Sequence, residues 1–141
     1  MNTAEDRLQV VRVHFDAINA SDRGQWDWAH ADPYEAEDSG WGVMNHDQHW
    51  QLILALRAAF PNLRLAMART FECTQAVIVL WTGSGTHTGP LPTAQGRVIA
   101  PTNKTATVRG CSTFEFEGGK VSRQLGFFDN GALLAQLGVL P

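Results

Sequence analysis

The sequence predicts an α+β fold in which helices precede a strongly curved antiparallel sheet. Apolar residues recur at helical spacing within residues 4–60, whereas alternating and β-branched runs dominate from residue 63 onward. Helical spacing indicates amphipathic helices, and alternation with a period of two indicates half-buried strands. Because the helices are grouped before the strands, the pattern favours α+β over alternating α/β organisation.

The first helix is expected over residues 4–20, because one face carries an apolar stripe. The stripe contains Leu8, Val11, Phe15 and Ile18. Thr3, followed by Asp6, is expected to cap the start of this helix. A second, short helix is expected through residues 26–29. It stops before Pro33, whose ring disfavours helical geometry in the preceding residue.

The rest of the chain is divided by polar segments and glycines. Residues 34–44 are polar and acidic, which predicts a loop with a short strand. A third helix is expected to start near Asn45 and to close at Pro61-Asn62. A Pro- and Gly-containing loop is expected over residues 91–96, and a short terminal helix over residues 131–137. The expected strands cover residues 63–71, 75–82, 104–117 and 120–128, the last two joined by a hairpin turn at Gly118-Gly119.

Length and charge limit the classes of protein that fit the sequence. With 141 residues the chain suits a single domain spanning residues 1–141. The net charge is −3 and there is no basic run, which argues against a nucleic-acid partner. The apolar stretches fall short of the roughly 20 residues that a membrane helix requires. Residues 1–7 lack an apolar signal-peptide core, so a cytoplasmic protein is expected.

Two segments end apolar strands in residues that can do chemistry. Residues 83–90 contain His87 among glycines and threonines, and residues 127–138 contain Asp129. Together with Pro101-Thr102-Asn103-Lys104 and the Gly118-Gly119-Lys120 turn, they resemble the signature of the SnoaL-like polyketide cyclase family. That family belongs to the nuclear-transport-factor-two-like (NTF2-like) superfamily. The resemblance implies a cone-shaped α+β barrel around a small-molecule pocket, a homodimer, and a reaction that needs no cofactor.

Strand alternation predicts which side chains face the pocket. In the long strand over residues 104–117, the even-numbered positions form the apolar set, which includes Gly110 and Ser112. In the returning strand, Gln124 and Gly126 share one face. A small apolar metabolite is the expected ligand. The expected substrate-binding residues are Trp41, Trp81, Ser112, Gln124 and Phe127.

Asp129 and His87 are the candidate catalytic residues. Asp129 either caps the terminal helix or acts as acid and base at the rim of the pocket. His87 either is a hydrogen-bonded structural residue at a strand bend or assists that chemistry. His46 and His49 could lie at the cavity mouth, whereas His14 is expected to be a partly buried packing residue. No histidine pair combines metal-ligand spacing with a nearby carboxylate, so no metal is predicted.

The resemblance also indicates where cyclase machinery would lie. In SnoaL-like cyclases a buried Asp acts as acid and base to close a polyketide ring by an intramolecular aldol reaction. Alignment at Gly119-Lys120 and at residues 136–138 puts that Asp on Gly126, its assisting histidine on Ser112, and a neighbouring glutamine on Gly110. The usual side chains are therefore missing here.

Two functions from different classes remain open. One is an enzyme of cyclase, isomerase or hydrolase type acting on an apolar, carbonyl-bearing substrate such as a polyketide. The other is a protein that holds an apolar metabolite without changing it. The fold cannot choose between them, because function depends on the site that the fold carries.

Overall fold

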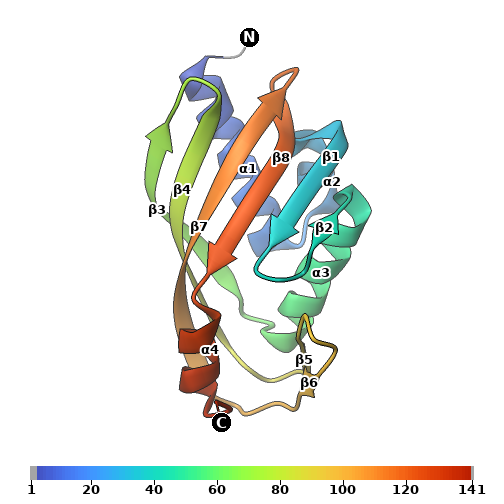
Figure 1. Ribbon diagram of the computed structural model, residues 1–141, viewed down its shortest axis with the longest axis vertical. Helices are drawn as coiled ribbons and strands as arrows, with labels where there is room; N and C mark the ends of the chain where they lie inside the picture. Colours follow the sequence, from blue (N-terminus) through green and yellow to red (C-terminus); the bar gives the residue numbers. More distant parts are fainter. Residues whose placement is uncertain (1–2, 141) are drawn as a thin grey trace.

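The computed structural model describes residues 3–140, which form one curved sheet with helices against one face (Figure 1). The strand order is β2-β1-β8-β7-β4-β3. These strands are β1 (His30–Asp38), β2 (Val43–Met44), β3 (Arg64–Glu72), β4 (Ala76–Thr86), β7 (Thr105–Glu117) and β8 (Lys120–Phe128). Two short strands, β5 (Leu91–Pro92) and β6 (Val98–Ile99), pair separately within the segment that joins β4 to β7.

Three helices cover the inner face of the sheet, and a fourth follows its last strand (Figure 1). They are α1 (Ala4–Ala20), α2 (Arg23–Ala29), α3 (His46–Ala59) and α4 (Asn130–Leu137). The predicted cap of α1 is confirmed, because Thr3 and Asp6 form a reciprocal capping box. Asn45 and Gln48 form the same arrangement at the start of α3. Each capping box satisfies backbone N–H groups that a first helical turn leaves without partners.

The acidic segment over residues 34–44 was predicted as a loop with a short strand, and the structure has more strand there than predicted. Residues 30–38 form β1, which pairs parallel with β8 and adds one parallel pairing to an otherwise antiparallel sheet. Tyr34 and Ala36 are buried while Glu35 is exposed, so the segment alternates as a half-buried strand does. The outward carboxylates gave this segment its loop-like composition.

β4 also continues past its predicted end at residue 82, through two glycines to Thr86. A Cβ at Gly83 would come within 2.9 Å of Leu65, and one at Gly85 would come within 2.9 Å of Phe60. The glycines thus allow neighbouring side chains to approach the strand closely. They form part of the strand instead of breaking it.

The inner face of the sheet packs against α1. Val11 and Phe15 of α1 join Val77, Val79 and Phe114 in one core cluster, and each is at most 4% exposed. Burying a side chain of this kind stabilises the fold by about 1.5–3 kcal/mol. The apolar stripe predicted for the first helix therefore holds the helix to the sheet.

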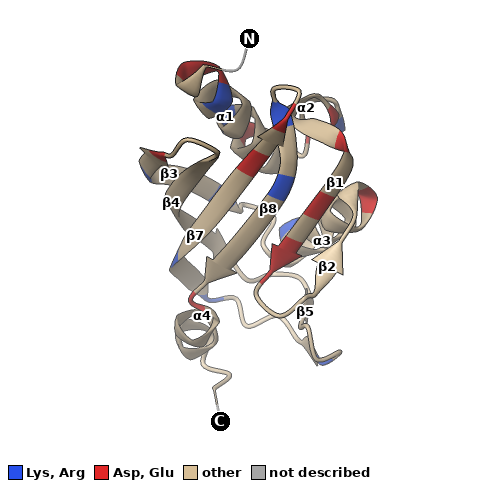
Figure 2. Cartoon of the chain, turned by 45° about the horizontal axis from the view of Figure 1, so that its top comes forward, with Lys and Arg blue, Asp and Glu red and all other residues tan. Residues whose placement is uncertain are grey.

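Charged side chains lie on the outer face. Arg123 on β8 is 3.4 Å from Glu35 on β1 and 3.9 Å from Glu115 on β7. Figure 2 shows this arrangement as a blue band on β8 between red bands on β1 and β7. Exposed pairs of this kind contribute at most about 1 kcal/mol.

The predicted fold class is confirmed: a curved sheet wraps around N-terminal helices and a short C-terminal helix follows. Within residues 3–140, no helix has both the length and the apolar character needed to cross a membrane.

Candidate functional site

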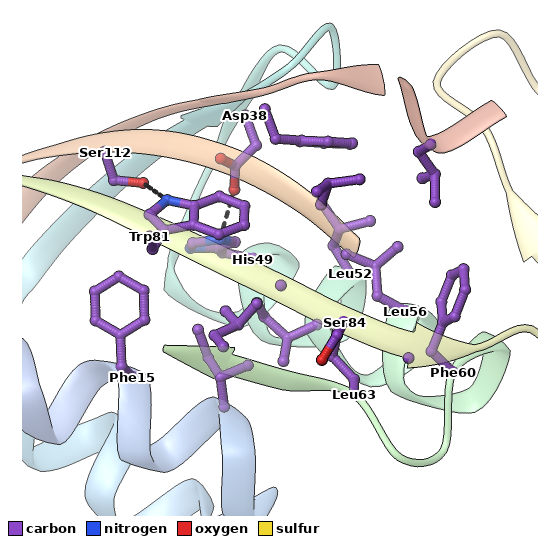
Figure 3. A pocket seen from close by; sticks show the side chains of 18 of the residues that line it. Phe15, Asp38, His49, Leu52, Leu56, Phe60, Leu63, Trp81, Ser84 and Ser112 are labelled. Carbon is purple, nitrogen blue, oxygen red and sulfur yellow. Dashed lines mark hydrogen bonds and ion pairs between the residues drawn. The ribbon is translucent and has the colours of Figure 1, made fainter. Parts of the chain in front are cut away.

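A cavity lies between the helices and the inner face of the sheet, and most of its wall is apolar (Figure 3). Phe15, Leu52 and Leu56 enter it from the helices, and Phe60 and Leu63 close its far end. Of the lining residues in the described part of the chain, none is Lys or Arg, and Asp38 supplies the one carboxylate. The cavity therefore suits an apolar ligand and disfavours an anionic one.

Asp38 is anchored by a buried pair of side chains. It ends β1, and its Oδ2 lies 2.9 Å from Nε2 of His49 on α3. Nδ1 of His49 lies 2.9 Å from the hydroxyl of Tyr34. Burial, helped by the negative charge of Asp38, raises the pKa of Tyr34 well above its usual range, so the phenol keeps its proton. Nε2–H of His49 donates to Oδ2 of Asp38, and Oδ1 lies over Gly126 of the neighbouring strand.

Ser112 and Gln124 supply further polar groups beside the carboxylate. The indole N–H of Trp81 donates to Oγ of Ser112 at 3.0 Å, and Nε2 of Gln124 lies 3.3 Å from the same oxygen. Oε1 of Gln124 is buried and has no hydrogen-bond partner in the described structure. An unpaired buried amide oxygen costs about 1–3 kcal/mol.

Two glycines of the sheet make room for these side chains. Asp38 and Gly126 are register partners on β1 and β8, and a Cβ at residue 126 would overlap Oδ1 of Asp38. Trp81 and Gly110 are register partners on β4 and β7, and a Cβ at residue 110 would overlap the indole. In each pair, the large side chain fills the space that its partner leaves empty.

A second group of histidines lies beside the first. His14 lines the cavity, and its Nδ1 lies 2.9 Å from Nε2 of His30. Nδ1 of His30 lies 3.1 Å from Nε2 of His46. Burial is the main cause that lowers the pKa of all three, so these rings favour the neutral form. Within residues 3–140, no three His, Cys, Asp or Glu side chains are arranged to hold a metal ion.

Residues 8–137 match the family model of the SnoaL-like polyketide cyclases. The chain belongs to the SnoaL-like polyketide cyclase family. No curated protein matches its sequence.

Solved structures with the same fold differ in their named activities. AclR from Streptomyces galilaeus, named as a hydroxylase, has a TM-score of 0.83 at 20% identity, covering 99% of this chain and 100% of AclR. A protein from Jannaschia sp. CCS1, named as a SnoaL-like polyketide cyclase, has a TM-score of 0.84 at 19% identity, covering 97% and 94%. An LEH-like epoxide hydrolase from M. tuberculosis has a TM-score of 0.70 at 16% identity, covering 94% and 90%. At these identities the likeness shows the NTF2-like fold alone.

Four of the five residues expected to bind substrate line the cavity of this SnoaL-like protein. They are Trp41, Trp81, Ser112 and Gln124. Phe127 is the exception, because it is 59% exposed on the outer face, and Phe128 lines the cavity instead. Strand alternation accounts for the difference: Gln124, Gly126 and Phe128 share the inner face, so Phe127 must point outward.

The two candidate catalytic residues lie outside the cavity lining. Asp129 caps α4, where its Oδ1 accepts the N–H of Ala132 at 2.9 Å. His87 is fully buried, and its Nδ1 accepts the N–H of Thr102 at 3.2 Å. These contacts match the structural alternatives stated for the two residues, a helix cap and a hydrogen-bonded histidine at the end of a strand.

Sequence reasoning missed Asp38 as a site residue. The signal was the alternation of Tyr34, Ala36 and Asp38 toward one face, with Glu35 and Glu37 between them. In a strand with this alternation, Asp38 shares the inner face of the sheet with Tyr34 and Ala36. His49, which the sequence allowed at the cavity mouth, is 2% exposed, lines the cavity and pairs with Asp38.

Proposed function

We propose that this SnoaL-like protein carries out acid/base chemistry on an apolar, carbonyl-bearing small molecule such as a polyketide, with Asp38 as its base. The observation that carries the proposal is the Asp38 carboxylate in a mostly apolar cavity, where His49 holds Oδ2 and Oδ1 lies over Gly126. Such chemistry needs a positioned base and hydrogen-bond donors, and it needs no cofactor.

The route of the proton follows from the contacts of Asp38. Oδ1 removes a proton from the carbon next to the substrate carbonyl, and the electron pair of that bond moves onto the carbonyl oxygen. The hydroxyl of Ser112 or the amide N–H of Gln124 can donate to the resulting enolate. In a ring closure, the enolate carbon bonds to a second carbonyl carbon. The protonated Asp38 then returns its proton to the alkoxide.

The surroundings of Asp38 favour an uncharged substrate. The described lining has no Lys or Arg, so a phosphate or carboxylate entering the cavity would lose its hydration without gaining a cation. Asp38, Ser112 and Gln124 line the same cavity, so a polar group on the ligand can meet hydrogen-bond partners there. An apolar molecule with a carbonyl or enol hydroxyl meets both requirements.

A general probe tests this chemistry without the natural substrate. Nitrobenzisoxazole is small, apolar and uncharged. A base removes its carbon-bound proton while the N–O bond breaks, which leaves a coloured cyanonitrophenolate. Asp38→Asn keeps the shape of the side chain and removes the base. Asp129→Asn is the matched control, because Asp129 caps α4 outside the cavity.

We expect the wild-type protein and Asp129→Asn to accelerate the elimination. Asp38→Asn should lose about 10²–10⁴-fold of that acceleration while still binding the probe. Equal rates in wild type and Asp38→Asn would contradict Asp38 as the base. Binding without acceleration in any of the three proteins would favour the other function, that of a protein that holds an apolar metabolite.

A further inference from the structure

Three histidines form a line of hydrogen bonds from the cavity toward the surface. Nδ1 of His14, which lines the cavity, pairs with Nε2 of His30, and Nδ1 of His30 pairs with Nε2 of His46. His14 and His30 are 3% and 7% exposed, whereas the His46 side chain is 27% exposed. The line therefore joins a buried group in the cavity to a group that meets solvent.

The indole of Trp26 shields this line. Trp26 is fully buried, and its ring lies 5.0 Å from that of His14, 4.2 Å from that of His30 and 5.8 Å from that of His46. The indole therefore packs against all three imidazole rings and covers one side of the line of histidines.

The geometry of the bonds ties the three tautomers together. Each neutral imidazole carries one proton, and each hydrogen bond needs one donor and one acceptor. Either Nδ1 carries the proton in all three rings, which leaves Nε2 of His14 bare, or Nε2 carries it in all three. With Nδ1–H in all three rings, Nε2 of His14 is a proton acceptor. With Nε2–H in all three rings, Nε2 of His14 is a donor.

We propose that His14, His30 and His46 form a proton relay that lets the surface residue set whether His14 offers the cavity an acceptor or a donor. When Nε2 of His14 takes a proton from the cavity, its Nδ1 proton passes to His30, and the Nδ1 proton of His30 passes to His46. The Nδ1 proton of His46 then leaves to solvent. One proton enters, one leaves, and every ring stays neutral.

The charges around His46 favour one of the two tautomer arrangements in the protein without a ligand. Oδ1 of Asp27 lies 3.7 Å from Nε2 of His46, which favours a proton on that nitrogen. Arg23 shares Asp27 with His46 and also pairs with Asp47 at 3.1 Å. The remaining titratable neighbours of His46 are His30, His49 and the Tyr34 ring. Asp27 therefore biases all three rings toward the order that leaves a donor in the cavity.

This relay would give the cavity a second proton-transfer group beside Asp38. One group can then take a proton from carbon while the other supplies a proton to oxygen. That use rests on the proposed function. The relay itself does not, so it is tested on the protein without substrate.

The test is ¹⁵N NMR of the full chain with labelled histidine, at a pH where all three rings are neutral. The chemical shifts of Nδ1 and Nε2 show which nitrogen carries the proton. Asp27→Asn removes the carboxylate that favours Nε2–H at His46. Asp47→Asn removes the other carboxylate partner of Arg23 without touching the relay, so it is the matched control.

We expect like tautomers in the three rings of the wild-type protein. Asp27→Asn should shift His46, His30 and His14 together toward Nδ1–H, and Asp47→Asn should leave them as in wild type. Unlike tautomers in the wild-type rings would overturn the relay, as would a change confined to His46 or no change in any ring. Neither outcome bears on Asp38→Asn, so the two proposals fail separately.

Discussion

Asp38 at the end of β1 lies directly across from Gly126 on β8, and its carboxylate fills the space that a side chain at residue 126 would occupy. The SnoaL-like resemblance places the cyclase Asp at residue 126. The carboxylate missing from β8 is thus matched by one supplied from the neighbouring strand. Ser112 and Gln124 line the same cavity, and these contacts support the proposed role of Asp38 in proton transfer.

Gly110→Ala should destabilise the protein, because its methyl group would overlap the indole of Trp81. Overpacking of this kind costs about 1–3 kcal/mol. Gly131→Ala in α4 is the matched control, since its Cβ would meet only Oδ1 of Asp129 at an ordinary 3.6 Å. An alanine inside a helix stabilises by about 0.5–1 kcal/mol relative to glycine. Urea unfolding of both variants measures the difference, and equal stabilities would contradict the close packing of Trp81 on Gly110.

Tyr34→Phe should lower the elimination rate with nitrobenzisoxazole while leaving KM nearly unchanged. The variant removes the hydroxyl that pairs with Nδ1 of His49, and His49 in turn orients Asp38. An unpaired buried nitrogen should also cost about 1–3 kcal/mol of stability. Steady-state kinetics with urea unfolding separate the two effects. A loss of stability at unchanged kcat would show that Tyr34 supports the fold without positioning the carboxylate.

Acid should destabilise the protein through His14 and His30. Burial lowers the pKa of both in the folded state below the usual value, so the unfolded chain binds more protons as pH falls through about 6.5. The free energy of unfolding then decreases with falling pH, by up to about 1.4 kcal/mol per pH unit for each group. This stability is present above the unfolded pKa and is lost below it.

Urea unfolding between about pH 7.5 and pH 5.5 measures that slope. His30→Gln removes one of the two titrating groups and should give a shallower slope than wild type. Wild-type stability that stays constant over this range would contradict the neutral, buried state of the two rings.

The sequence predicted most of the fold, because its local signals agree with its tertiary structure. The helix over residues 4–20 has the predicted bounds, since its cap and its apolar stripe point to the same segment. The strand over residues 120–128 also has its predicted bounds, since a glycine turn starts it and alternation continues through it. Where the hydrophobic periodicity and the capping or turn residues indicate the same boundaries, an element can be predicted without knowledge of its tertiary contacts.

The site was harder to predict, because it depends on pairing between strands distant in sequence. Asp38 meets Gly126 through the register of β1 with β8, and no local pattern near Asp38 encodes that pairing. Asp129 stood out because it follows an apolar strand, but the same position is the N-cap of α4. Local sequence can identify a carboxylate, whereas its place in the cavity depends on the sheet.

Exchanging Asp38 and Gly126 across the sheet shows directly whether Asp38 replaces the carboxylate that residue 126 lacks. Asp38→Ala, Gly126→Asp and the double variant are compared with wild type for elimination of nitrobenzisoxazole and for urea stability. We expect Asp38→Ala to be folded but inactive, and Gly126→Asp to be destabilised because two carboxylates compete for one space. The double variant should regain at least about 10-fold in rate over Asp38→Ala, with stabilities that couple by about 0.5–3 kcal/mol. Additive stabilities and a double variant as inactive as Asp38→Ala would contradict the conclusion that Asp38 fills the catalytic space left by Gly126.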